Sequence, residues 1–247
     1  MRFAGEATVL VPVILFLGTL IRSSLGFGEA LVSVPLLALV MPVEVAAPLA
    51  VLVSITVAGI VVIQDRSHIH LRSAGWLVLA TLPGIPLGLL LLKAVAEPIV
   101  KGILAAVIIA FSIYSLAHRE MRELKHDRPA WLFGFIAGIL GGAYGMNGPP
   151  LVIYGSLRRW TPKHFRATLQ GYFFPASLIG MGGYGLAGLW TRTVNHFFLW
   201  SLPAVLIAIF LGRAINQHLN PRQFGFYVHV GLLLIGVLLM VQSVRGV

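Results

Sequence analysis

Ten apolar segments follow one another along this chain, and only short polar or Pro/Gly-rich breaks separate them. The hydrocarbon core of a bilayer is about 30 Å thick, and a helix needs about 20 residues to cross it. The third to fifth and the eighth to tenth segments are long enough for that. The segments cover residues 6–22, 29–41, 45–63, 73–92, 98–117, 131–144, 149–157, 167–187, 194–213 and 222–243.

The composition excludes the main alternative classes of protein. Hydrophobic residues make up 58% of the chain and charged residues 11%, whereas soluble domains contain about 25% charged residues. The net charge of +10 is explained by basic loops that orient membrane helices, so no nucleic-acid partner is expected. The chain has no cysteine, which excludes disulfides and thiolate metal sites. We therefore expect an all-α polytopic membrane protein.

The four shorter segments form two adjoining pairs, and each pair meets at a glycine-rich break, at residues 23–28 and 141–148. In lipid an unpaired backbone N–H or C=O group costs several kcal/mol, so non-helical backbone persists only inside protein or beside a water-filled cavity. Two such breaks at membrane depth therefore predict a cavity. The alternative is that their glycines only let helices pack closely. We expect close packing for Gly84 and Gly88, and for Gly134, Gly138 and Gly142.

The two halves of the chain share landmarks at nearly constant spacing, which favours a duplication over coincidence. We divide the chain into a first membrane repeat (1–117), a cytoplasmic linker (118–130) and a second membrane repeat (131–247). Each repeat would hold one glycine-broken re-entrant helix pair and three transmembrane helices. Four landmarks recur in order after 119 to 123 residues: Gly26-Phe27-Gly28 with Gly145-Met146-Asn147, Pro42 with Pro162, Leu82-Pro83 with Leu202-Pro203, and Pro98 with Pro221.

Five segments per repeat is an odd number, so the second repeat must enter the membrane from the opposite side, as an inverted-topology repeat. If each short pair returns to the side where it started, five basic residues lie on one face and twelve on the other. If each pair were one broken spanning helix, the split would be nine against eight. The positive-inside rule favours the first arrangement, which places both termini outside the cytoplasm.

The breaks also predict the chemistry of the cavity. Re-entrant helices that begin near Glu29 and Pro149 would point their N-termini into it. A helix N-terminus carries about half a positive charge and free N–H groups, which suits an anion. Pro149 and Pro150 fit the first turn of such a helix, and Asn147 or Gly148 would be its cap.

Glu29 is the only carboxylate placed deep in an apolar segment, and an ionisable residue inside the membrane is a functional candidate by default. Ionised, it would cap its helix and pair with Arg22. Protonated, it would no longer repel an anion at the same helix end, which would couple proton binding to substrate binding. Arg22 is either a clamp for the substrate or a residue that extends to the membrane surface.

The remaining candidates lie in or next to the breaks, except Gln170, which would bond either the substrate or a neighbouring helix. No cofactor is expected, because the Gly-x-Gly-x-x-Gly pattern at 180–185 lies in an apolar segment with no preceding strand. His68-x-His70 is a poor metal signature, so no metal is expected either. The proposed substrate-binding set is Arg22, Ser24, Gly26, Phe27, Gly28, Tyr144, Gly145, Asn147, Gly148 and Gln170, with Glu29 as the proton-coupling residue.

Both halves, each with a glycine-rich break followed by a short apolar stretch, resemble the sulfite exporter TauE/SafE family of membrane transporters. In that family the break is typically a glycine run followed within several residues by proline. Here the first break runs from Gly26 to Pro35, and the second reads GGAYGMNGPP at residues 141–150. Glu29 and Asn147 depart from the pattern, because the family often has glycine in those places.

The resemblance covers nearly the whole chain and implies a transporter of the bacterial inner membrane, driven by an ion gradient. Family members are associated with sulfite, organosulfonates and some other organic anions. We therefore expect a secondary transporter of a small anion, surrounded by lipid, and the sequence leaves a homodimer open. Three alternatives stay open: a passive anion channel, a structural subunit with a filled midplane, and an intramembrane enzyme, for which the sequence offers no convincing nucleophile–base pair or metal cluster.

Overall fold

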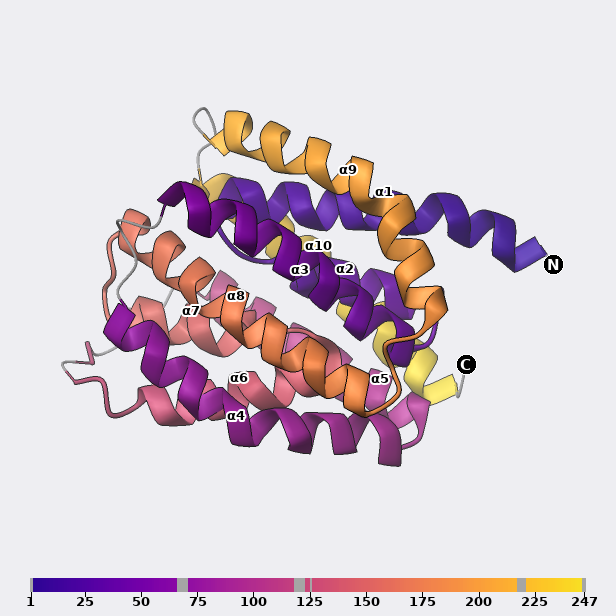
Figure 1. Cartoon of the computed structure of the whole chain (residues 1–247), viewed down its shortest axis with the longest axis horizontal. Helices are drawn as coiled ribbons and strands as arrows, with labels where there is room; N and C mark the ends of the chain where they lie inside the picture. Colours follow the sequence, from indigo (N-terminus) through magenta and orange to yellow (C-terminus); the bar gives the residue numbers. More distant parts are fainter. Residues whose placement is uncertain (1, 66–70, 118–122, 125, 217–220, 246–247) are drawn as a thin grey trace.

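The computed structural model describes residues 2–65, 71–117, 123–124, 126–216 and 221–245. Over these residues the backbone forms ten α-helices and no strand (Figure 1), which confirms the predicted all-α class. The helices are α1 (Arg2–Leu25), α2 (Glu29–Ala38), α3 (Val43–Asp65), α4 (Leu71–Ala94), α5 (Glu97–Leu116), α6 (Ala130–Tyr144), α7 (Gly148–Leu157), α8 (Pro162–Leu186), α9 (Arg192–Asn216) and α10 (Pro221–Arg245).

Among the residues that the structure describes, five helices are long and apolar enough to cross a membrane, so the chain is a multi-pass membrane protein. The sequence predicts a sixth span in the eighth segment. α8 has 25 residues but is less apolar, since it contains Gln170, Pro175 and five glycines. It also begins five residues before the predicted start, because Thr161 is extended and Pro162 fits the first helical turn. The five spans are Val43–Ile63, Ser73–Ala94, Glu97–Leu116, Arg192–Ile215 and Gln223–Arg245.

Both termini lie at the same end of the helix bundle, on the right of Figure 1. The turns from α2 to α3, from α4 to α5 and from α8 to α9 lie at that end as well, and the turn from α7 to α8 lies at the other. This is the path expected if each short pair returns to the side where it started. Which end faces the cytoplasm stays a prediction from the loop charges.

The helices pair across the two halves of the sequence. α4 packs along α6, and α9 packs along α1, so a long helix of each half supports the short pair of the other. α3 packs against α8, and α5 against α10. A duplication related by a two-fold axis would produce this exchange of partners. The inverted relation and the boundaries 1–117, 118–130 and 131–247 stay predictions, and residues 118–122 and 125 of the linker lie outside the described residues.

Glycines bring α4 and α6 close together. A Cβ atom added to Gly138 would lie 3.0 Å from the Cα of Gly84, and one added to Gly142 would lie 3.1 Å from the Cα of Gly88. Side chains at these positions would push the two helices apart, so these glycines serve close packing, as predicted. The contact also holds the end of α6, where the second break begins.

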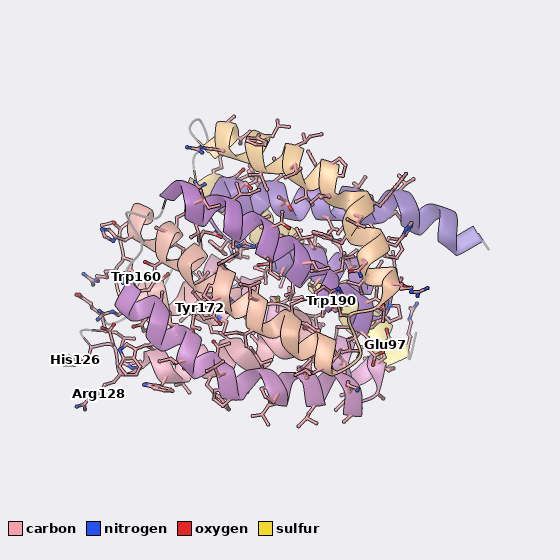
Figure 2. The ribbon with its side chains drawn as sticks, in the orientation of Figure 1. Glu97, His126, Arg128, Trp160, Tyr172 and Trp190 are labelled. Atoms are coloured by element: carbon pink, nitrogen blue, oxygen red, sulfur yellow. The ribbon has the colours of Figure 1, made fainter. Side chains whose placement is uncertain are left out.

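Polar and aromatic side chains mark the two ends of the bundle. Figure 2 shows His126, Arg128 and Trp160 at one end, Glu97 and Trp190 at the other, and Tyr172 between them. Tryptophan is enriched where a membrane meets water. The layer between these levels is the part of the bundle that we expect to lie in lipid, and Tyr172 marks its middle.

Candidate functional site: two glycine breaks at one cavity

The first break reverses the chain between α1 and α2 in three residues. α1 ends at Leu25, and Gly26 and Gly28 follow in the left-handed region with φ of 90° and 102°. Glycine reaches such angles without the steric cost that a Cβ atom would add. α2 then begins at Glu29, as predicted, with Gly28 as its N-cap.

The second break has the same length. α6 ends at Tyr144, Gly145 has a φ of 65°, and Asn147 is the N-cap of α7. The Asn147 side chain makes no capping hydrogen bond. α7 begins at Gly148, one residue before the predicted Pro149, and both α2 and α7 are ten residues long.

The two breaks meet at one cavity in the middle of the bundle. Its volume is about 20 Å³ for the centres of water molecules, which is room for about one water. Residues of both breaks line it, together with side chains from α1, α3 and α8. The lining residues are Arg22, Phe27, Gly28, Glu29, Ala30, Leu31, Ser54, Gly145, Met146, Asn147, Gly148 and Phe173.

Arg22 and Glu29 form a buried ion pair at this cavity. The Nη1 atom of Arg22 lies 2.6 Å from Oε2 of Glu29, and their side chains are 4% and 1% exposed. The guanidinium carbon also lies 4.9 Å from the centre of the Phe173 ring, within the range of a cation–π contact. Arg22 therefore does not extend to the membrane surface, which was one of the two roles open from the sequence.

Two further side chains hold the guanidinium group. Nη1 of Arg22 donates to Ser54 Oγ at 2.8 Å, and Nη2 donates to Gln170 Oε1 at 2.7 Å. Gln170 in turn donates from Nε2 to the carbonyl of Gly26 at 2.7 Å, and Ser177 donates to Ser54 at 3.2 Å. The first break is thus tied to α3 and α8 through Arg22.

The ion pair uses only one of the two carboxylate oxygens of Glu29. Oε1 of Glu29 is buried and has no hydrogen-bond partner among the described residues, and the same holds for Nε of Arg22. Buried polar atoms are nearly always paired, so such exceptions are candidate sites for a proton, a water molecule or a ligand.

The second break carries a neutral network instead. Nδ2 of Asn147 donates to the hydroxyl of Tyr172 at 3.4 Å. That hydroxyl lies 2.7 Å from Oγ1 of Thr81 on α4. None of these three side chains is charged, so the cavity has one charged wall and one polar, uncharged wall.

Four of the predicted substrate-binding residues do not line the cavity. Ser24 donates to the carbonyls of Leu20 at 2.8 Å and of Gly212 on α9 at 3.4 Å, so it joins α1 to α9. The hydroxyl of Tyr144 donates to the carbonyl of Val100 on α5 at 3.0 Å. Neither residue lines the cavity. Gly26 and Gln170 are not in the lining either; Gln170 holds Arg22 and donates to the carbonyl of Gly26 behind the cavity wall.

Other lining residues were missed by the sequence analysis. Ser54 could have been predicted as a site residue, because it is a polar residue in the middle of an apolar helix. Nothing in the sequence distinguishes Phe173 and Leu31, since apolar residues are common throughout the chain. Within the described residues no group of three His, Asp or Glu side chains could hold a metal ion, and His68 and His70 lie outside those residues.

Comparisons with known proteins identify the family of this chain. A protein of Cupriavidus necator, named as a probable sulfite/organosulfonate exporter TauE, is 24% identical over 255 residues that cover 98% of each chain. No solved structure matches the chain. The sequence model of the sulfite exporter TauE/SafE family matches residues 10–239, which is nearly the whole chain. The chain therefore belongs to the sulfite exporter TauE/SafE family of transporters.

Proposed function

We propose that the protein is a secondary active transporter that moves sulfite, an organosulfonate or a related small anion across the bacterial inner membrane, coupled to a proton gradient. The observation that carries the proposal is the buried Arg22–Glu29 pair at a cavity lined by both glycine breaks. The name of the C. necator relative, a probable sulfite/organosulfonate exporter, supports the substrate class.

The first break offers what a small oxyanion needs. Arg22 keeps its charge at any physiological pH, and its planar group can bind two oxygens at once. The first turn of α2 lines the same cavity through Gly28, Glu29, Ala30 and Leu31, and its backbone N–H groups have no partner within the helix. Their partial positive charge adds to that of Arg22.

Proton coupling follows from competition for Arg22. In this structure the guanidinium group of Arg22 donates a hydrogen bond to the Glu29 carboxylate, so a substrate anion must displace that carboxylate. An ionised Glu29 beside a bound anion would leave an uncompensated negative charge in a buried site, which is strongly unfavourable. Protonation neutralises the Glu29 carboxylate, so the positive charge of Arg22 becomes available to the substrate anion. One proton would then bind with each anion.

The size of the cavity favours a transporter over a passive channel. Sulfite has four heavy atoms and does not fit a cavity with room for about one water. The site must widen to admit it, as in transporters that open to one side at a time around a central site. A channel would instead give ohmic currents that do not depend on a proton gradient.

Glu29→Gln tests the coupling, because glutamine resembles the protonated acid in shape but cannot release a proton. We expect the variant to bind sulfite while flux into proteoliposomes no longer responds to a pH gradient. Glu123→Gln is the matched control, since Glu123 is an exposed carboxylate whose side chain is 46% exposed. Unchanged proton-driven flux in Glu29→Gln would remove Glu29 from the mechanism.

The substrate is best identified by thermal unfolding in detergent with sulfite, thiosulfate and organosulfonates. A ligand at 100 times its Kd stabilises the folded protein by about 2.7 kcal/mol, so at equal concentrations the size of the stabilisation ranks the anions by affinity. We expect the stabilisation to be lost in Arg22→Gln. Stabilisation that survives this change would place the anion elsewhere.

A further inference from the structure

A second, larger cavity lies at the end of the bundle that holds the termini. Its volume is about 130 Å³ for the centres of water molecules, several times that of the central cavity. It lies between the first turns of α3 and α5 and the last turn of α4. Its lining residues are Val43, Glu44, Leu92, Val95, Glu97 and Val100, and we call it the outer cavity. Figure 2 shows Glu97 at this end of the molecule.

Tyr144 lies between the outer cavity and the central cavity. Its side chain is fully buried, and its hydroxyl donates to the carbonyl of Val100, which lines the outer cavity. The next two residues along the chain, Gly145 and Met146, line the central cavity. The ring of Tyr144 thus fills space that one cavity would need in order to reach the other.

α3 connects the same two cavities on its own side. Val43 lines the outer cavity, and one turn further on, the carbonyl of Ala47 faces Gly145 of the second break. Val43, Ala47, Val100, Tyr144 and Met146 belong to one buried apolar cluster. Within these five residues the only side-chain polar atom is the Tyr144 hydroxyl, so its hydrogen bond to Val100 is the specific link that fixes the barrier.

We propose that the outer cavity is the extracytoplasmic vestibule of the transport path and that Tyr144 is its gate residue. The inference rests on the anion transport proposed above. When the hydrogen bond to Val100 breaks and the ring turns away, the central cavity opens into the vestibule. The role of Tyr144 is therefore to separate the substrate from the outside, not to bind it.

The charge of the vestibule affects the ions that pass through it. Glu44 and Glu97 are both exposed at its rim, and one ammonium group, that of Lys101, lies 3.4 Å from Glu97. Two carboxylates against one ammonium lower the local concentration of anions. Anions are therefore less favoured in the vestibule than cations, in whichever direction the substrate passes.

The chain contains no cysteine, so one introduced thiol is the only thiol and reports on one place. Val95→Cys places it in the vestibule, and Met146→Cys places it in the central cavity. Both are labelled in intact cells with a membrane-impermeant anionic methanethiosulfonate. Met146→Cys is then combined with Tyr144→Phe, which keeps the ring and removes the hydroxyl, and with Tyr144→Ala. Tyr154→Phe is the control, because its equally buried hydroxyl donates to Asp127 at 3.0 Å, away from both cavities.

We expect Val95→Cys to react readily and Met146→Cys slowly. Labelling of Met146→Cys should become about five-fold faster with Tyr144→Phe, as expected for the loss of one hydrogen bond, and faster still with Tyr144→Ala. Tyr154→Phe should leave it unchanged. At Val95→Cys a cationic reagent should react about three-fold faster than the anionic one, and Glu44→Gln with Glu97→Gln should remove the difference.

Two results would overturn the proposal. One is equal labelling of Met146→Cys in folded protein with and without the Tyr144 changes. The other is labelling of Val95→Cys only from the cytoplasmic side, in inside-out vesicles. Labelling needs no transported anion, so its outcome is separate from that of the flux measurements on Glu29.

Discussion

The two glycine breaks share a backbone and differ in charge. Each joins two helices through three residues, uses a left-handed glycine and leads into a ten-residue helix. The first carries a buried ion pair between Arg22 and Glu29, whereas the second presents the amide of Asn147. The comparison separates two requirements of an anion site, a reversal of the chain at membrane depth and a fixed charge.

The helices that follow the breaks differ as well. The first turn of α2 consists of residues that all have a backbone N–H, so it can donate hydrogen bonds to an anion. The first turn of α7 contains Pro149 and Pro150, which have none. The second break therefore contributes shape and few donors. We expect the first break to bind and the second to close the site.

The largest expected effect comes from Arg22→Met. Removal of one partner from a buried ion pair costs about 3–5 kcal/mol, because the other charge stays buried without compensation. Thermal unfolding in detergent should show this loss, and Glu29→Gln added to Arg22→Met should recover most of it. Asn147→Met in the second break should cost much less, since no charge is left behind. Equal losses at Arg22 and Asn147 would mean that charge is not what distinguishes the two breaks.

A smaller effect is expected from alanine at one left-handed glycine of each break, Gly28 and Gly145, and for different reasons. At Gly28 the nearest atom to a new Cβ is 3.6 Å away, so the cost is torsional, about 1–2 kcal/mol. At Gly145 a Cβ would lie 2.7 Å from the carbonyl oxygen of Ala47, which adds about 1–3 kcal/mol for overpacking. Denaturant unfolding of both variants should find Gly145→Ala the less stable. The reverse order would contradict the close approach of α3 to the second break.

Much of the fold could be predicted, because lipid leaves a chain few choices. Apolar segments must be helical, and a glycine-rich break at membrane depth must be buried. Those two constraints predicted all ten helices and both breaks. The pairing of Arg22 with Glu29 was also within reach, since the two residues flank one short turn. Ser54 and Gln170 reach the same guanidinium group from α3 and α8, and which faces of these helices meet depends on packing along their whole length.

Proximity to a break in the sequence was the least reliable basis for predicting which side chains line the cavity. Ser24 follows Arg22 by two residues, which is about 200° around an α-helix, so it points to α9 while Arg22 points into the cavity. Tyr144 directly precedes Gly145, yet its side chain is directed to α5. Beside a break, the direction of a side chain is set by the last helical turn and not by the loop.

The smallest expected effect on stability comes from Asn147→Ala, and it separates ligand binding from structure in the uncharged break. Asn147 lines the cavity, and its hydrogen bond to Tyr172 is long at 3.4 Å, so the folded protein should lose less than about 1 kcal/mol. If the amide donates to the bound anion, the Kd for sulfite should rise about three- to ten-fold in a thermal-shift titration. Thr81→Ala, which removes the other partner of Tyr172, is the control and should change stability more than affinity. An Asn147→Ala variant that loses stability but binds sulfite as before would give the second break a purely structural role.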